Sequence, residues 1–396
     1  MTQAKFIATP QFEPVAQSLT GVQASVSAVS PSAVMCVFGS PGTGKTTALI
    51  GRFVELVRGG IDPSQILVLA ATRDSAAALR DALALELQSA TEGPLARTAT
   101  SMAFALIRQE ALGAGQPLPQ LISGAKQDSL ISQLLMDAQD AGRTELWPAH
   151  ISETTRSLKG FRAELRDLIA VCQEWGISSS QLSELGERSL AGTSKQPQWL
   201  AAAQVFEAYE RLLSQPEFQN QFDSPSLIQR AISLLEANPA NQLAGVKAIL
   251  IDDAQELTPT IAKLVRVIAK QSSAGVSLFG DPDSTTLGFR GADPMLMTQL
   301  ARAIADQGQP QHFYLEARSG SETATQALEP QTATPVLGKI AALIPPAGAG
   351  QQRKSLGATH LRVQVLSSKF AEVAWLARQL RELHLYQGVR WQDMAV

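Results

Sequence analysis

Eight residues near the start of the chain have the types and spacing that bind the phosphates of a nucleotide. They are Gly39, Ser40, Pro41, Gly42, Thr43, Gly44, Lys45 and Thr46, and they fit the pattern G-x-x-x-x-G-K-[ST]. Glycines let backbone N–H groups turn toward phosphate oxygens, and the following helix N-terminus adds its positive dipole end. Lys45 can reach the β- and γ-phosphates, and the Thr46 hydroxyl can ligate Mg²⁺. The pattern therefore predicts an ATP or GTP site with Mg²⁺ as cofactor, and we include Thr47 in it.

Two adjacent aspartates can supply the acidic groups that phosphoryl transfer needs. Asp252 and Asp253 directly follow a near-continuous apolar run at residues 246–251, which is typical of a buried parallel strand. Asp252 is placed to hold Mg²⁺, and Asp253 is placed to orient or deprotonate the attacking water. Alone, the pair would be read as an exposed acidic turn, but its combination with the phosphate-binding pattern favours catalysis.

The elements that must position these groups alternate between strands and helices. The apolar run "PSAVMCVFG" at residues 31–39 ends in glycine and is typical of a buried strand. Residues 46–60 have apolar side chains at helical spacing and end at Gly59-Gly60. A strand before and a helix after the loop are the context that the pattern requires. The sequence thus predicts an α/β fold with a parallel sheet.

Composition limits the function classes. With 396 residues, 45% hydrophobic, the chain has room for about 2–3 domains. A net charge of −3 means that any contact with nucleic acid must be local. Cys36 and Cys172 lie too far apart for a zinc pattern or a disulfide framework, which predicts a reducing, cytoplasmic compartment. No signal peptide and no run of 18 apolar residues is visible, so we expect no membrane partner.

Several segments, in order, resemble superfamily 1 DNA helicases of the UvrD/Rep/PcrA/RecB type. "IDDAQEL" at 251–257 resembles the family's D-E-x-Q-D box, and "SLFGDPDSTTLGFRGADPMLM" at 277–297 resembles motif III, the most distinctive piece. "ILVLAATRDSAAALRDAL" at 66–83 and "ARTATSMAFALIR" at 96–108 resemble motifs Ia and Ib. The resemblance implies an ATP-dependent helicase in which ATP sits between two RecA-like domains.

The resemblance also implies roles for individual residues. "LTGVQASVSAV" resembles the Q-motif, which would place Gln23 at the adenine edge. Gln255 would help to couple the nucleotide to DNA, and Arg318, in the motif IV-like segment 314–328, would reach the γ-phosphate from the second motor domain. The expected DNA contacts are Thr72, Arg73, Thr98, Ser101, Phe289 and Arg290. Such threonines and serines also cap helices, and such a phenylalanine also packs in a loop, so both roles stay open.

The segment at about 110–240 looks most like the subunits of the AdnAB helicase–nuclease, and more like AdnB than AdnA. This resemblance implies single-stranded and duplex DNA and a second helicase–nuclease subunit as partners, 3′-to-5′ movement, and a role in DNA repair at double-strand breaks. The alternative is a subunit that binds ATP and DNA without acting as a motor.

Departures from the family pattern motivate that alternative. Asp253 stands where the family has Glu, and Ser284 stands where motif III has Gln. Thr100 replaces the common motif Ib histidine, and Leu287 replaces a common aromatic. Because serine reaches less far than glutamine, these changes indicate either a weakened motor or a subunit with little hydrolysis.

The resemblance also divides the chain. A first RecA-like domain is expected at 1–109 and 201–310, a helical insertion at 110–200, and the beginning of a second RecA-like domain at 311–396. The insertion either contacts duplex DNA or packs only as a helical bundle. The Pro-, Ala- and Gly-rich stretch 329–359 is expected to be flexible. Motifs V and VI and a nuclease constellation are not found, so we expect an N-terminal fragment that binds ATP but does not unwind DNA alone.

Overall fold

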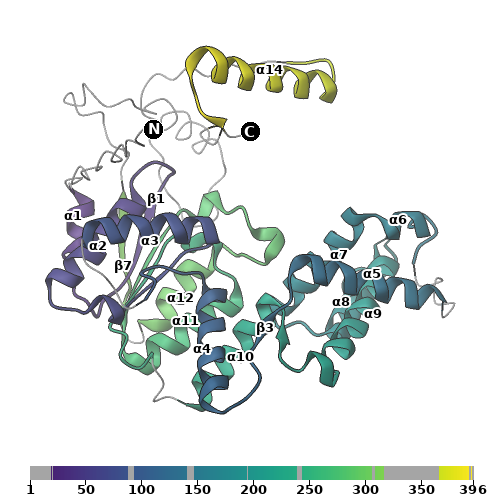
Figure 1. Ribbon diagram of the computed structural model, residues 1–396, viewed down its shortest axis with the longest axis horizontal. Coiled ribbons are helices and arrows are strands. Elements are labelled where there is room, and N and C mark those ends of the chain that lie inside the picture. The colour runs from purple at the N-terminus through teal and green to yellow at the C-terminus, as the bar shows by residue number, and fades with distance from the viewer. Residues whose placement is uncertain are drawn as a thin grey trace, which may run out of the picture.

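The computed structural model describes residues 19, 21–87, 93–140, 147–193, 195–238, 243–305, 308–315, 365–391 and 394. Arg318 and the stretch 329–359 lie outside the described residues. The described chain forms a sheet domain and, beside it, a lobe made of helices (Figure 1). The fold is mixed α/β with a parallel sheet, which confirms the fold class predicted from the sequence.

The sheet domain is built on five parallel strands in the order β2-β5-β6-β1-β7. Their bounds are Val34–Gly39 (β1), Ile66–Leu69 (β2), Ala248–Ile251 (β5), Gly275–Gly280 (β6) and Gln311–Leu315 (β7). All residues of β2, β5 and β6 are buried, as expected for strands covered on both faces. The carboxyl ends of the strands share one edge of the sheet, where ligands bind in open α/β folds.

Helices cover both faces of this sheet. One face carries Val22–Ser27 (α1), Lys45–Arg58 (α2) and Arg73–Leu87 (α3). The other carries Ala99–Gly113 (α4), Ser224–Ala237 (α10), Pro259–Ser272 (α11) and Leu296–Ile304 (α12). The pleat of β1 distributes its side chains between the two cores: Met35 and Val37 join the first, and Cys36 and Phe38 join the second.

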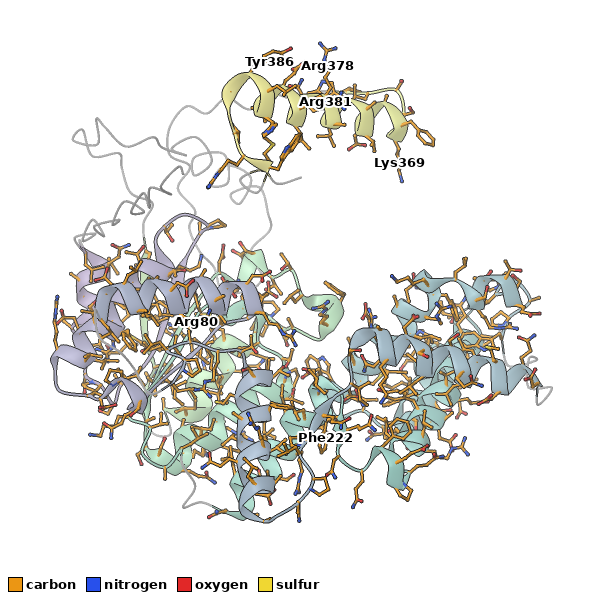
Figure 2. All side chains as sticks on the ribbon, viewed as in Figure 1. Arg80, Phe222, Lys369, Arg378, Arg381 and Tyr386 are labelled. Carbon is orange, nitrogen blue, oxygen red and sulfur yellow. The ribbon has the colours of Figure 1, made fainter. Side chains whose placement is uncertain are left out.

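The helical lobe comprises Gly124–Asp140 (α5), Glu153–Ser157 (α6), Lys159–Glu174 (α7), Ser179–Ser189 (α8) and Gln196–Leu213 (α9). It has its own core, in which Ile131, Leu165, Leu182 and Phe206 are fully or almost fully buried. A short parallel pair, Gln120–Leu121 (β3) and Gln221–Phe222 (β4), closes the lobe at its base. Phe222 lies at this junction with the sheet domain (Figure 2).

At two of the domain boundaries expected from the sequence, a neighbouring element packs with a different part of the molecule. Helix α9 was expected in the first motor domain, but Phe206 and Tyr209 bury their rings in the core of the helical lobe. Strand β7 was expected to start a second domain, but it pairs with β1 in the first sheet. The sequence did not reveal either edge because both depend on which distant element covers an apolar face.

Several short or peripheral elements complete the described chain. The 3-10 helices are Pro63–Gln65 (η1), Pro216–Phe218 (η3), Ala254–Glu256 (η4), Pro282–Ser284 (η5) and Gly288–Arg290 (η6). Helix α14, at Lys369–Gln387, has no buried residue, and Arg378, Arg381 and Tyr386 project from it (Figure 2). In the part of the chain that the structure describes, no helix has both the length and the apolar character needed to cross a bilayer.

Candidate active site

The glycine-rich loop joins the end of β1 to the start of α2. Gly42 and Gly44 have φ angles of 81° and 85°, in the left-handed region that favours glycine. A Cβ atom at Gly39 would collide with the Thr43 side chain, and one at Gly44 would collide with the Gln23 amide. Lys45 Nζ lies across the loop and donates to the carbonyl oxygens of Gly39 at 2.8 Å and Ser40 at 3.4 Å. The loop is therefore a tight backbone cradle with its lysine already positioned over it.

Gln23 is held against this cradle. Its buried side chain donates to the carbonyl oxygens of Thr43 at 3.4 Å and Gly44 at 3.3 Å. Arg52 on α2 fixes the end of α1, because its guanidinium donates to the carbonyl oxygens of Ser27, Val29 and Ser30. Burial lowers the pKa of Arg52 to about 10, so the side chain keeps its charge at neutral pH. Contact of Gln23 with adenine stays a prediction.

Asp252 and Thr46 meet at the carboxyl edge of the sheet. The Thr46 hydroxyl donates to Asp252 Oδ2 at 2.9 Å. Asp252 is only 5% exposed, and its Oδ1 has no hydrogen-bond partner among the described residues. Burial raises the pKa of Asp252 to about 6, aided by the charge of Asp253 and opposed by the Thr46 hydrogen bond and by Lys45. A buried oxygen without a donor beside a hydroxyl fits a hard cation such as Mg²⁺, which takes oxygen ligands.

Asp253 occupies a strained backbone position. Its φ of 51° and ψ of 46° are left-handed, a conformation that costs a non-glycine residue about 1–2 kcal/mol. The turn sends the next residues back toward the sheet, where Gln255 is buried. Gln255 Nε2 donates to Asp253 Oδ1 at 3.3 Å, and Gln255 Oε1 accepts from the backbone N–H of Asp281 at 3.0 Å. Gln255 therefore bridges the two acidic segments that the sequence singled out.

The loop after β6, residues 281–291, is called here the motif III loop. A Cβ atom at Gly280, which precedes it, would lie 2.8 Å from Gln255 Oε1 and 2.9 Å from Met297 Sδ. Asp281 is fully buried and accepts from the Ser284 hydroxyl at 2.6 Å. Glycine at position 280 thus permits the close approach of Gln255, and Ser284 serves the internal structure of the loop.

Glu256 is a residue of this site to which the sequence gave no role. It is buried, and its Oε1 accepts from the N–H of Thr286 at 2.7 Å and from the Thr286 hydroxyl at 2.9 Å. Its Oε2 accepts from the N–H of Leu287 at 2.9 Å. Glu256 therefore fixes the middle of the motif III loop to the segment that carries Asp252 and Asp253. Its place as the last acidic residue of the D-E-x-Q-D-like box was the available signal.

The expected DNA-contacting residues lie around the same edge of the sheet. Phe289 is 55% exposed in η6, and the Arg290 guanidinium lies 5.3 Å from the centre of its ring. Thr72 Oγ1 accepts from the N–H of Ser75 at 3.1 Å, and Thr98 Oγ1 accepts from the N–H of Ser101 at 3.2 Å. These two hydroxyls cap α3 and α4 in this structure. Arg73 and Ser101 are exposed, and DNA contact by all six residues stays a prediction.

The chain is also similar to known DNA helicases. The UvrD/REP helicase N-terminal domain matches residues 21–305. DNA helicase IV of Escherichia coli (strain K12) is 27% identical over 300 residues, which covers 67% of this chain and 40% of that protein. ATP-dependent DNA helicase srs2 of Schizosaccharomyces pombe is 22% identical over 375 residues, which covers 90% of this chain and 39% of that protein.

A mycobacterial DNA helicase is also similar to this chain. ATP-dependent DNA helicase UvrD2 of Mycobacterium tuberculosis (strain ATCC 25618 / H37Rv) is 25% identical over 286 residues, which covers 70% of this chain and 38% of that protein. The aligned part of the chain therefore spans 38–40% of the length of these curated relatives.

Proposed function

We propose a motor function on the premise that this chain belongs to the UvrD/REP helicase family. In this proposal the chain hydrolyses ATP and couples hydrolysis to 3′-to-5′ movement on single-stranded DNA, in DNA repair or the processing of double-strand breaks. The relatives named above are DNA helicases, and two of them are described as ATP-dependent. The observation that carries the proposal is the linked set of contacts from Thr46–Asp252 through Asp253–Gln255 to Asp281.

The binding step uses the glycine-rich loop. Backbone N–H groups of residues 39–47 would surround the phosphates, and Lys45 would exchange its two carbonyl partners for phosphate oxygens. Thr46 and Asp252 are the residues that would hold Mg²⁺, which would supply charge neutralisation at the phosphates. We propose that Asp253 accepts a hydrogen bond from the attacking water and thereby orients it, and that Arg318 acts from the second domain.

The coupling step uses Gln255. Its amide joins Asp253 to the backbone of Asp281, and Asp281 begins the loop that carries Phe289 and Arg290. A shift of Asp253 on hydrolysis would break or lengthen the hydrogen bond that Gln255 donates to it. The loop would then move relative to the sheet, and with it the aromatic surface that we propose for DNA.

The partners and the division of the chain extend this proposal. We propose a first RecA-like domain at 1–109 and 201–310, a helical insertion at 110–200, and a second RecA-like domain that starts at 311. In the structure, α9 packs with the helical lobe and β7 pairs with β1 in the first sheet, so the exact boundaries are part of the proposal. The resemblance of residues 110–240 supports an AdnB-like chain with a second helicase–nuclease subunit. Copurification of such a subunit with the tagged chain would test this.

The motor proposal is tested by ATP hydrolysis with and without single-stranded DNA, using the chain and its Lys45→Ala variant. DNA should stimulate the wild-type rate, and Lys45→Ala should lower it on the order of 100-fold, as expected for loss of a preorganised positive group. Lys263→Ala is the matched control, because Lys263 is an exposed lysine on α11, away from the loop. Stimulated rates that are equal for the wild type and Lys45→Ala would contradict the proposal.

A second candidate function is a subunit that binds ATP and DNA with little or no hydrolysis. The Ser284 hydroxyl favours it, because it is engaged with Asp281 inside the loop at the position where the family has a longer glutamine. Tight binding of both ligands, with equally low hydrolysis in the wild type and Lys45→Ala, would support this candidate over the motor.

A further inference from the structure

The end of α7 in the helical lobe lies against the motif III loop of the sheet domain. Trp175, which ends α7, is 47% exposed although it is one of the largest apolar side chains of the lobe. Helix α7 packs on η6, the turn that carries Phe289 and Arg290. Two exposed aromatic residues from distant parts of the chain are therefore gathered at one junction.

Gly291 makes this close approach possible. Its φ is 88°, and a Cβ atom there would lie 3.2 Å from Glu174 Cβ and 3.7 Å from Trp175 Nε1. Any side chain at position 291 would push the end of α7 away from the loop. The indole nitrogen of Trp175 therefore lies beside Gly291, one residue beyond Arg290, with space between them that a side chain at position 291 would fill.

Glu174 anchors the neighbouring residue on the sheet domain. Its side chain is 7% exposed, and Glu174 Oε2 accepts a hydrogen bond from the Thr260 hydroxyl. Thr260 belongs to the first turn of α11, which follows the D-E-x-Q-D-like box. This buried contact holds the end of α7, so the position of Trp175 beside the loop does not depend on a ligand.

We propose that Trp175 is a second base-stacking residue for single-stranded DNA, working with Phe289 across the junction of the two parts of the molecule. This inference rests on the proposed function and adds to it a DNA-contacting residue from the helical lobe. Exposed aromatic rings beside a cation form the usual surface for single-stranded nucleic acid, since every base has a face that stacks. The Arg290 guanidinium lies over the Phe289 ring and would supply the positive charge for a phosphate there.

Binding of a fluorescein-labelled oligodeoxythymidine to the 396-residue chain tests the proposal. Trp175→Ala should weaken binding about tenfold, because loss of one stacking ring costs about 1–3 kcal/mol, and Trp175→Phe should restore most of the affinity. Phe289→Ala should weaken binding similarly. Trp391→Ala is the matched control, because Trp391 is 55% exposed and lies outside both the lobe and the loop.

Two further readouts separate stacking from a structural role. A base that stacks on the indole quenches its fluorescence, so DNA-dependent quenching should be lost in Trp175→Phe and retained in Trp391→Phe. The salt dependence of binding should be unchanged in Trp175→Ala, whereas Arg290→Ala should reduce the slope by about one phosphate contact. The quenching comparison still decides the matter where Trp175→Ala does not fold.

The outcomes are distinguishable. A wild-type chain that does not bind the oligonucleotide would overturn the proposed function itself. Wild-type binding that Phe289→Ala weakens, but Trp175→Ala and Trp175→Phe leave unchanged in affinity and quenching, would overturn this inference alone. Equal loss of affinity for a long blunt duplex in Trp175→Ala would also overturn it, because every base pair except the two at the ends is already stacked on both faces.

Discussion

The nucleotide side and the proposed DNA side of the sheet edge are built in opposite ways. Asp252, Gln255 and Asp281 are buried and joined to neighbouring loops by hydrogen bonds. Arg73 and Phe289 are exposed. Chemistry on a phosphate needs polar groups that are fixed in place before the substrate binds, and burying these groups costs stability. A DNA strand that is released at every step of movement needs contacts that are individually weak. The net charge of −3 agrees with weak binding of this kind.

The largest expected effect is at Asp252. Asp252→Asn keeps an oxygen for the Thr46 hydroxyl but removes the buried charge, so ATP turnover should fall by about 100-fold or more. The same change should raise the free energy of unfolding without nucleotide by on the order of 1 kcal/mol, as is common when a strained active site is relaxed. Turnover assays and urea denaturation measure the two effects.

The control for this prediction is Asp81→Asn, which alters an exposed carboxylate on α3. It should change neither turnover nor stability. If Asp252→Asn hydrolysed ATP at the wild-type rate, the nucleotide side would not depend on its buried carboxylate, and the contrast between the two sides would fail.

The next effect concerns stability at Glu256. Glu256→Ala leaves the N–H groups of Thr286 and Leu287 without their acceptor and should lower the free energy of unfolding by about 2–3 kcal/mol. Glu256→Gln keeps one acceptor oxygen and should lose less. Glu236→Ala, on the exposed side of α10, is the control and should be nearly neutral. Equal stability of the Glu256→Ala and Glu236→Ala variants would show that the loop is not fixed by this carboxylate.

The sequence was sufficient to predict the strand before the glycine-rich loop and the helix after it. The glycine-rich loop requires left-handed residues and a strand and helix on either side, and all of these features are contiguous in the chain. The fold class followed from the same alternation and from the apolar runs at 31–39 and 246–251, which contain β1 and β5. Local sequence patterns are sufficient to predict structure where neighbouring residues alone determine the backbone geometry.

The remaining half depends on contacts between segments far apart in sequence. Glu256 meets Leu287, and Gly291 meets Glu174 and Trp175, only because β5, β6 and α7 pack as they do. A carboxylate inside an acidic box and a tryptophan at a helix end carry no sign of such partners. The sequence assigned α9 to the sheet domain for the same reason. The apolar pattern of a helix predicts that one face is buried, but not which element packs against that face.

A smaller effect separates two roles of Thr98. Thr98→Ala removes the cap of α4 and should lower the free energy of unfolding by about 1 kcal/mol. Thr98→Asp keeps a capping oxygen, so stability should return, but its negative charge should weaken single-stranded DNA binding by repelling a phosphate. Thermal melts and oligonucleotide titrations measure the two roles.

The matched control is Ser152→Asp, at the cap of α6 in the helical lobe. It should leave both stability and DNA binding unchanged. Wild-type affinity in Thr98→Asp would remove Thr98 from the DNA side and leave it a capping residue only.

The smallest expected effect is at Glu174. It tests whether buried carboxylates occur only on the nucleotide side. Burial raises the pKa of Glu174 above its ordinary 4.5, hydrogen bonds from Thr258 and Thr260 oppose this, and the charge of Asp223 adds to it. Because the folded state holds the proton more tightly, the stability from Glu174 is complete below pH 4.5 and is lost as the pH rises through the folded-state pKa.

Glutamine has no proton to lose, so the melting temperature of Glu174→Gln relative to wild type should rise from pH 4 toward pH 8. The control Glu184→Gln changes an exposed carboxylate of the same lobe. Parallel melting curves for Glu174→Gln and wild type across this range would mean that Glu174 is not penalised by burial. If the two melting temperatures instead diverge with pH, Glu174 is a buried carboxylate near Phe289, comparable to Asp252 on the nucleotide side. Exposed side chains would then be confined to the surface that we propose for DNA.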